Sequence, residues 1–296
     1  MKKYKIILII FVLATFSVGI WYFVDAKSMQ EISFSEVEAG FEDVHEELSL
    51  EEDVDESLSP SLEEIVIPSS LTTRASRWAY FWKDFTTEEK EKYENFTRPP
   101  GPLHVGIQVG PWKNTEVCSE LAGLKRNGSG AVGGGKTEVD TVLIIARKVE
   151  ALLEARGVVV DLLPATVPSR YVADAFVSIH ADGNSNSAVS GFKIASPQTD
   201  FSGKSSTLAS ELRDSYEEAT KLDTDDNVTR RMSAYYAFNW RRYLHTVHPM
   251  TPAVIVETGF MTSPTDRAII VSNPDKAAKG IADGIMNFLA KSVSQD

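Results

Sequence analysis

Three side chains that could carry out a hydrolysis stand at the ends of predicted elements. Glu138 opens a predicted helix directly after a glycine-rich loop, whereas His180 and Glu257 each end an apolar strand. Carboxylates and imidazoles suit zinc, and a catalytic zinc has three protein ligands and one position left for water. A separate carboxylate can take the proton from that water. The three residues therefore point to metal-assisted hydrolysis, provided that the fold brings them together.

Each of the three also has a purely structural interpretation. An acid in the first turn of a helix, such as Glu138, is favoured by the helix dipole. His180 alone could be an ordinary half-buried histidine. Glu257 could form an ion pair with Arg241 or Arg242. Taken singly, none of the three decides the chemistry.

Strands and helices alternate from Leu103 onward, as expected for a parallel sheet. The predicted strands have the apolar composition of a sheet buried on both faces. The fold class is therefore α/β: a single domain with a mostly parallel sheet covered by helices on both faces. Strands are predicted at 104–109, 158–163, 174–180, 191–195 and 252–257, and helices at 138–155, 205–219 and 275–289.

The residues before this domain divide into three parts. Three lysines precede an uncharged apolar run from Ile6 to Val24, which is long enough to cross a bilayer. We expect residues 1–26 to be a cytoplasmic N-terminus and transmembrane anchor, with the C-terminal domain outside the cell membrane. The alternative is secretion after cleavage of a signal peptide. Residues 27–74 are predicted to be an acidic disordered linker, and residues 75–102 an aromatic helical segment with a Pro-rich boundary.

The acidity of the chain is concentrated in that linker. Fourteen acids and no Lys or Arg lie between Glu31 and Glu64, within a chain of 42 acids and 30 bases. The remainder is close to neutral, so no basic field indicates a nucleic-acid partner. In the next segment, Trp78, Phe81, Trp82 and Phe85 share one helical face. Residues 86–89 then form a capping-box sequence that predicts a second short helix.

Five segments follow one another between Leu103 and Leu289: Val105–Gly110, Lys136–Asp140, Val177–Asp182, Pro252–Phe260 and the closing helix. Together they resemble the zinc-dependent N-acetylmuramoyl-L-alanine amidases, which cut peptidoglycan, and they occur in that family's order. The resemblance implies that Glu138 and His180 are zinc ligands and that Glu257 is the catalytic acid/base. It implies hydrolysis, by a zinc-activated water, of the amide that joins N-acetylmuramic acid to L-alanine.

One position departs from the family pattern. The family has a histidine ligand directly after the glycine that matches Gly110, but this chain has Pro111, which offers no donor atom. His248 is the first substitute ligand to consider, with a substrate contact as its alternative. A catalytically impaired domain that binds peptidoglycan or regulates a wall hydrolase is the second function, and a metal-dependent peptidase on a similar scaffold is the third. The other substitutes weighed are His104, His245, Asp182 and Asp140. Cys118, the single cysteine, is interpreted as a loop or small apolar position.

Overall fold

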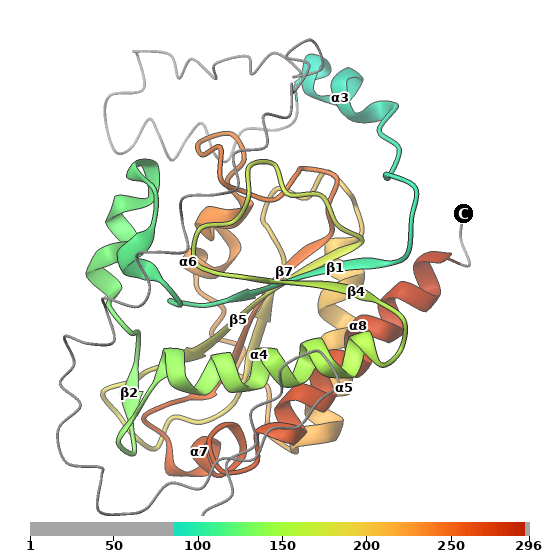
Figure 1. The fold of residues 1–296 in the computed structure, drawn as a ribbon. Helices are drawn as coiled ribbons and strands as arrows, with labels where there is room; N and C mark the ends of the chain where they lie inside the picture. Colours follow the sequence, from blue (N-terminus) through green and yellow to red (C-terminus); the bar gives the residue numbers. More distant parts are fainter. Residues whose placement is uncertain (1–85, 294–296) are drawn as a thin grey trace, which may run out of the picture. The chain divides into compact units, whose positions relative to one another are not determined.

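A computed structural model describes residues 86–293, and its centre is a five-stranded sheet (Figure 1). The strand order is β4-β1-β5-β7-β6. All neighbouring strands are parallel except β6 and β7, which run antiparallel. The mostly parallel α/β sheet expected from the sequence is therefore confirmed. The strands are β1 (His104–Val109), β4 (Val159–Leu163), β5 (Ala175–Asp182), β6 (Lys193–Ala195) and β7 (Ala253–Phe260).

Three long helices cover one face of this sheet. α4 (Glu138–Glu154), α5 (Ser205–Thr220) and α8 (Pro274–Val293) bury their apolar sides against alternate residues of β1, β5 and β7. In β5 these residues are Ala175, Val177, Ile179 and Ala181, all buried. The helices form the larger core because strand side chains alternate between faces and the apolar set faces α4, α5 and α8.

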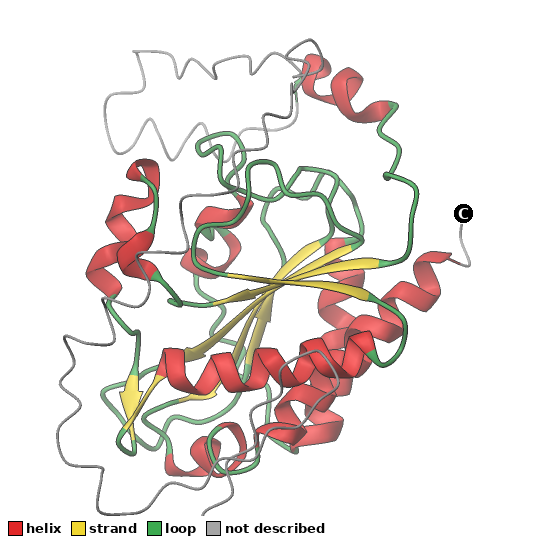
Figure 2. Cartoon of the chain, viewed as in Figure 1, coloured by secondary structure: helices red, strands yellow, loops and turns green. Residues whose placement is uncertain are grey.

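The opposite face is covered mainly by irregular segments, so the expectation of helices on both faces is wrong. Phe176 and Ile255 belong to a smaller core with residues of the segments 163–173 and 232–247. Figure 2 draws the cover of this face mostly as loop. The helical pieces here are short: α6 (Arg230–Ser233) and the 3-10 turn η5 (Tyr236–Phe238). The strand residues on this face include the polar Gln108, which the irregular cover can hydrogen-bond. The strand composition predicted two buried faces correctly, but it could not tell a helical cover from an irregular one.

The remaining elements connect this frame. The long β1–α4 connection contains η3 (Asn114–Glu116), η4 (Ser119–Asn127) and a two-stranded ribbon of β2 (Val132–Gly133) and β3 (Lys136–Thr137). α7 (Pro264–Ile270) follows β7. β5 and β7 both continue beyond the predicted ends at residues 180 and 257, because Asp182 and Phe260 still pair across the sheet. The predicted functional residues therefore lie inside the paired region near the carboxyl ends of the strands.

The predicted capping-box helix is confirmed as α3 (Thr87–Glu94). The Thr86 side chain accepts a hydrogen bond from the Glu89 amide, and the Glu89 carboxylate accepts one from the Thr86 amide. The anchor, the linker and the Trp78–Phe85 aromatic face lie outside the described residues. Within residues 86–293, no helix combines the length and apolar character that crossing a membrane requires.

Two glycines bring α8 against α5 at backbone distance. A Cβ added to Gly280 would lie 2.8 Å from Tyr216 Cα, and one added to Gly284 would lie 2.6 Å from Leu212 Cα. Real Cβ atoms are essentially never found that close, so the two helices can approach only without side chains at these positions. The spacing of four residues places both glycines on the same side of α8.

Replacing Gly284 with alanine is expected to lower the free energy of unfolding by about 1–3 kcal/mol, the usual effect of overpacking. Helix propensity alone predicts the opposite sign, a gain of about 0.5–1 kcal/mol. Urea denaturation measures the difference. Gly123→Ala is the control, because nothing lies within 4 Å of its added Cβ. A Gly284→Ala protein as stable as the control would contradict the close packing.

Candidate active site

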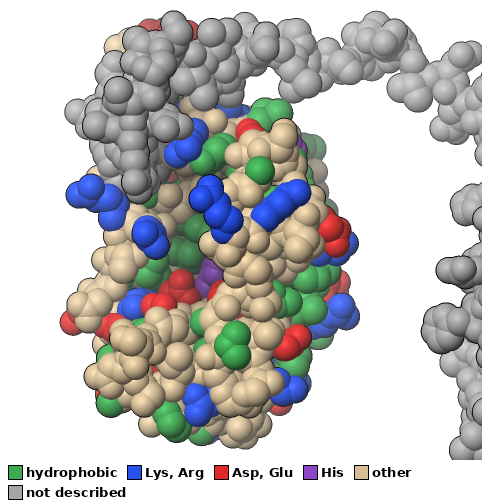
Figure 3. All heavy atoms as spheres, turned by 90° about the vertical axis from the view of Figure 1, so that its left-hand side faces the viewer, with side chains coloured by type: hydrophobic (Ala, Val, Ile, Leu, Met, Phe, Trp, Pro, Cys, Tyr) green, Lys and Arg blue, Asp and Glu red, His purple; other side chains and the backbone are tan. Residues whose placement is uncertain are grey.

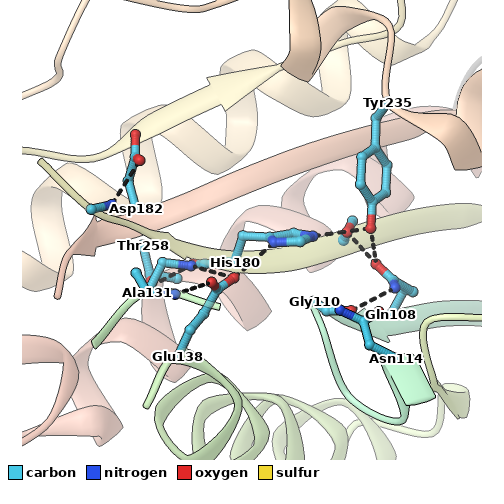
Figure 4. A network of polar contacts seen from close by, with 12 residues as sticks. Gln108, Gly110, Asn114, Ala131, Glu138, His180, Asp182, Tyr235 and Thr258 are labelled. Carbon is cyan, nitrogen blue, oxygen red and sulfur yellow. Dashed lines mark hydrogen bonds and ion pairs between the residues drawn. The ribbon is translucent and has the colours of Figure 1, made fainter. Parts of the chain in front are cut away.

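The carboxyl ends of the central strands bring the three predicted residues together. His180 of β5 and Glu257 of β7 are paired in register across the parallel ladder. Both belong to the strand face that lacks long helices, whereas α4 lies on the other face and presents Glu138 from its first turn. Glu138 reaches the site around the carboxyl edge of the sheet (Figure 4). The functional residues therefore come from two adjacent strands and a helix N-terminus.

Glu138 is fixed by the start of α4. Thr137 is the N-cap and forms a capping box with Asp140, which sets the direction of the first turn. The Glu138 Oε2 accepts a hydrogen bond from the Ala131 amide at 3.0 Å. Its Oε1 lies 2.9 Å from Nδ1 of His180. Glu138 is buried, with one carboxylate oxygen anchored by the backbone and the other facing the imidazole.

A chain of hydrogen bonds orients the other side of the His180 ring. The Tyr235 hydroxyl lies 3.0 Å from His180 Nε2 and donates to Gln108 Oε1 at 3.1 Å (Figure 4). With that hydroxyl donating to Gln108, its oxygen is free to accept from Nε2–H. In the neutral ring Nδ1 then faces Glu138 with its lone pair, and in the protonated ring Nδ1–H donates to Glu138. Such outer partners select the tautomer of a metal-binding histidine.

The charge state of His180 follows from its neighbours. Burial by itself lowers the pKa of His180, but the Tyr235 oxygen and the carboxylates of Glu138 and Glu257 outweigh burial and hold the pKa well above its usual range. Protonation of the His180 ring is therefore favoured, with Nδ1 facing the Glu138 carboxylate. The same two atoms are the ones that a bound cation would contact.

Glu257 stands beside this pair with an unsatisfied oxygen. Its Oε2 is buried and has no hydrogen-bond partner among the described residues. Burial raises the pKa of Glu257 to about 7, with Glu138 and Asp182 adding to the rise while His180 and Lys193 oppose it. A carboxyl group that titrates near neutral pH can both accept and donate a proton, as a general acid/base must.

The site is partly open to solvent, since the His180 side chain is 17% exposed. Figure 3 shows acidic side chains and a histidine together in a hollow of the molecular surface. Basic side chains lie along one side of this hollow. The hollow therefore has an acidic centre with basic side chains on one side.

Glu257 does not pair with Arg241, contrary to the structural alternative drawn from the sequence. The Arg241 guanidinium instead binds the Glu89 carboxylate, with Nε–Oε1 at 2.8 Å and Nη2–Oε2 at 2.7 Å. This pair fastens α3 to the segment before β7. Burial alone would raise the pKa of Glu89, but the hydrogen bonds from Arg241 and Thr86 outweigh burial and lower the pKa below its usual value.

His248 lies away from Glu138 and His180. Its neighbour Val247 pairs with Tyr171, which precedes the first residue of β5, whereas His180 lies near the end of that strand. The His248 ring stacks on Phe96, with centroids 4.6 Å apart. Burial, with help from Arg170 and Lys92, lowers the pKa of His248 to about 4. The structure thus accounts for His248 as a packed, neutral ring near the opposite edge of the sheet.

The other substitute donors are also engaged elsewhere. His104 contacts Asp161 at the start of β1. Asp182 binds Lys193, and Asp140 caps α4. His245 contacts Glu120 and Cys118. Across residues 86–293, no third His, Cys, Asp or Glu donor joins Glu138 and His180 in one cluster.

Pro111 directly follows Gly110, whose backbone lies beside both members of the candidate ligand pair. A Cβ on Gly110 would lie 3.1 Å from His180 Nδ1 and 3.2 Å from Glu138 Oε1. Pro111 itself is buried, and its carbonyl accepts from the Asn114 amide. A side-chain donor at residue 111 would therefore start beside the pair, and proline supplies none.

The family model for N-acetylmuramoyl-L-alanine amidases matches residues 121–287, more than half of the chain. This protein belongs to that family. The match begins within η4 and ends in α8, so it includes Glu138, His180 and Glu257. The resemblance drawn from the sequence is thereby confirmed at the level of the family.

Individual relatives of this amidase-family chain are distant. N-acetylmuramoyl-L-alanine amidase LytC of Bacillus subtilis is 29% identical over 174 residues, which cover 54% of this chain and 33% of that protein. The chain thus spans about a third of that relative's length. Amidase AmiA of Salmonella typhimurium is 26% identical over 208 residues, covering 71% of its length. A solved amidase of Nostoc punctiforme has 25% identity and a TM-score of 0.45, with 64% of this chain and 97% of that chain covered.

Two residues of the site were missed by sequence reasoning. Gln108 is fully buried in β1 and donates through Nε2 to the Gly110 carbonyl at 3.2 Å while Oε1 receives Tyr235. A buried amide inside an apolar strand needs partners, and that was the available signal. Tyr235 carried none, because it lies in an irregular segment 55 residues after His180.

Proposed function

We propose that this domain hydrolyses the amide between N-acetylmuramic acid and L-alanine in peptidoglycan. The observation that carries the proposal is the contact of Glu138 and His180 beside Glu257, whose buried oxygen has no partner. Membership of the amidase family supports the reaction class. The names of the relatives support peptidoglycan as the substrate.

Glu138 and His180 fit zinc as two of its ligands. A carboxylate oxygen and an imidazole nitrogen, here 2.9 Å apart, are donor types that zinc takes. When bound there, zinc would polarise the scissile carbonyl and lower the pKa of a water molecule. With two protein donors instead of three, we expect weaker binding than at a complete catalytic site.

Glu257 is the acid/base of the proposed reaction. With a pKa near neutral, its carboxylate can take a proton from the attacking water and return it to the nitrogen of the leaving L-alanine. Tyr235 and Gln108 keep the His180 ring in one orientation throughout. In the overall reaction one water molecule is consumed, the C–N bond breaks, and a lactyl carboxylate and a free amine form.

A single variant tests this assignment. His180→Ala in the full-length chain is expected to abolish release of stem peptides from purified peptidoglycan assayed with zinc present. The products of the unmodified protein should carry a free L-alanine amine, which separates this reaction from a peptidase cut within the stem. Thr207→Ala, on the exposed side of α5, serves as the control for handling. Full release of stem peptides by His180→Ala would refute the proposed site.

Pro111 favours a second candidate function. A domain that holds zinc weakly could bind peptidoglycan, or regulate a wall hydrolase, without turnover. Co-sedimentation with peptidoglycan in the absence of hydrolysis, even at high zinc concentration, would select this alternative.

The proposed location rests on the sequence of residues 1–26 alone. The lysines and the apolar run favour a single-pass anchor with the domain outside the cell, where peptidoglycan lies. Secretion after cleavage is the alternative. The mass of the mature protein distinguishes an uncleaved anchor from a cleaved signal peptide.

A further inference from the structure

A second group of metal-ligand side chains lies outside the candidate active site. Cys118 is the N-cap of η4, Glu120 belongs to its first turn, and His245 lies in the segment that leads to β7. Their donor atoms, one from each residue, all lie within 4.8 Å of one another. We propose that Cys118, Glu120 and His245 form a zinc site that fastens the β1–α4 connection to the segment before β7.

The distances fit tetrahedral zinc with little rearrangement. Zinc–sulfur and zinc–nitrogen bonds of about 2.3 and 2.0 Å place the two donors about 3.5 Å apart at a tetrahedral angle. Cys118 Sγ and His245 Nδ1 are 3.6 Å apart. Glu120 Oε1 and His245 Nδ1 are 2.7 Å apart, and would separate by roughly 0.6 Å to reach the corresponding zinc spacing.

The direction of the contacts distinguishes a metal site from a nucleophilic triad. Cys118 Sγ and Glu120 Oε1 both face the same ring nitrogen, Nδ1 of His245. A cysteine–histidine–acid triad would need the thiol and the carboxylate at opposite nitrogens of the ring. Donors that converge on one point are instead the arrangement that a cation requires.

The Glu120 carboxylate is already positioned by the backbone. Its Oε1 accepts from the His245 amide at 2.8 Å, and its Oε2 accepts from the Leu244 amide at 3.1 Å. These bonds leave lone pairs for a metal, since each oxygen can accept twice. They also keep the carboxylate in place before a metal arrives, so its ordering adds little to the cost of binding.

The surroundings suit a structural ion with one position open to solvent. Val117, Leu121 and Ala165 form a small buried cluster beside Cys118, and Tyr236 packs against it. The side chains of Glu120 and His245 remain 29% and 30% exposed, so water can take the fourth position. Binding releases the thiol proton of Cys118 and any proton shared by His245 and Glu120.

This zinc would hold the rim of the candidate active site. The β1–α4 connection carries Pro111 at its start, and Tyr236 follows Tyr235, the partner of His180. Fastening η4 to residues 244–245 therefore joins the two segments that flank the His180 ring. The proposal does not depend on hydrolysis, since it concerns different donors.

Cobalt titration of the full-length chain tests the proposal, because a thiolate bound to Co²⁺ gives a charge-transfer absorption. The unmodified protein and His180→Ala should both show this band, whereas Cys118→Ser should lose it and bind zinc at least about tenfold more weakly at this site. Ser119→Ala is the matched control, an exposed neighbour expected to keep the band. His245→Gln repeats the test if Cys118→Ser folds poorly.

Thermal unfolding gives a second readout. Zinc at a hundred times the Kd of this site should raise the Tm of His180→Ala by about 5–10 °C, and adding Cys118→Ser to His180→Ala should reduce that rise to about half or less. No thiolate band in the unmodified protein, or an unchanged band in Cys118→Ser, would overturn the zinc site. If His180→Ala loses hydrolysis but keeps the cobalt–thiolate band, the two metal sites are separate.

Discussion

Replacing Glu257 with glutamine is expected to reduce hydrolysis of peptidoglycan by about 10²–10⁴-fold, the usual contribution of a general acid/base. Glutamine keeps the shape of the side chain but cannot exchange a proton. Initial rates of amine release from purified peptidoglycan, measured with zinc at saturation, give the ratio. Because Glu138 and His180 are unchanged, zinc binding should stay within a small factor of the unmodified protein.

The same variant should not unfold the protein. Glu257 Oε2 is buried without a partner, and burial of the charged form is what raises the Glu257 pKa to about 7. A neutral amide removes this cost, so stability at pH 8 should be unchanged or higher. Glu154→Gln, exposed at the end of α4, controls for the change of charge. Near-normal hydrolysis by Glu257→Gln would remove Glu257 from the proposed mechanism.

The second large effect that we expect is a rise in zinc affinity when histidine replaces Pro111. Pro111→His adds an imidazole directly after Gly110, the residue at which an added Cβ would lie 3.1 Å from His180 Nδ1 and 3.2 Å from Glu138 Oε1. Zinc affinity should rise by at least about 10–100-fold, which is the scale that even an outer-shell partner contributes. Isothermal titration with zinc measures this change, and hydrolysis at limiting zinc should rise in parallel.

A control variant separates the effect of adding a zinc ligand from the effect of removing proline. Pro111→Ala makes the same change to the backbone without adding a donor, so it should bind zinc as the unmodified protein does. Equal gains in both variants would mean that proline acted through loop rigidity. A Pro111→His protein with unchanged zinc affinity would show that the site is complete without residue 111.

The sequence predicted those parts of the molecule in which local pattern and fold agree. The β1 strand and α4 were predicted almost to the residue, because alternating or helical apolar spacing is bounded there by glycine and a cap. Glu138, His180 and Glu257 were brought together as expected, since the ends of parallel strands share one edge. The irregular cover of the other sheet face could not be predicted, because its packing depends on contacts between distant segments.

The site's supporting contacts were less accessible to sequence reasoning. Tyr235 reaches His180 from a loop without periodicity, and only the fold brings the two together. Arg241 binds Glu89, which lies 152 residues away in the sequence. Cys118 gave no motif, because its partners Glu120 and His245 come from both near and far along the chain.

The in-register pairing of β5 and β7 has a consequence for how such a domain can diverge. Backbone hydrogen bonds between the two strands set the separation of His180 and Glu257, and the Thr258 hydroxyl donates to the His180 carbonyl at 2.8 Å. Neither restraint involves the β1–α4 connection. Substitutions can therefore accumulate in that connection, including the loss of a donor at residue 111, without displacing the histidine or the acid. A lineage that loses the donor keeps the rest of the site in place, and a single codon change could restore it.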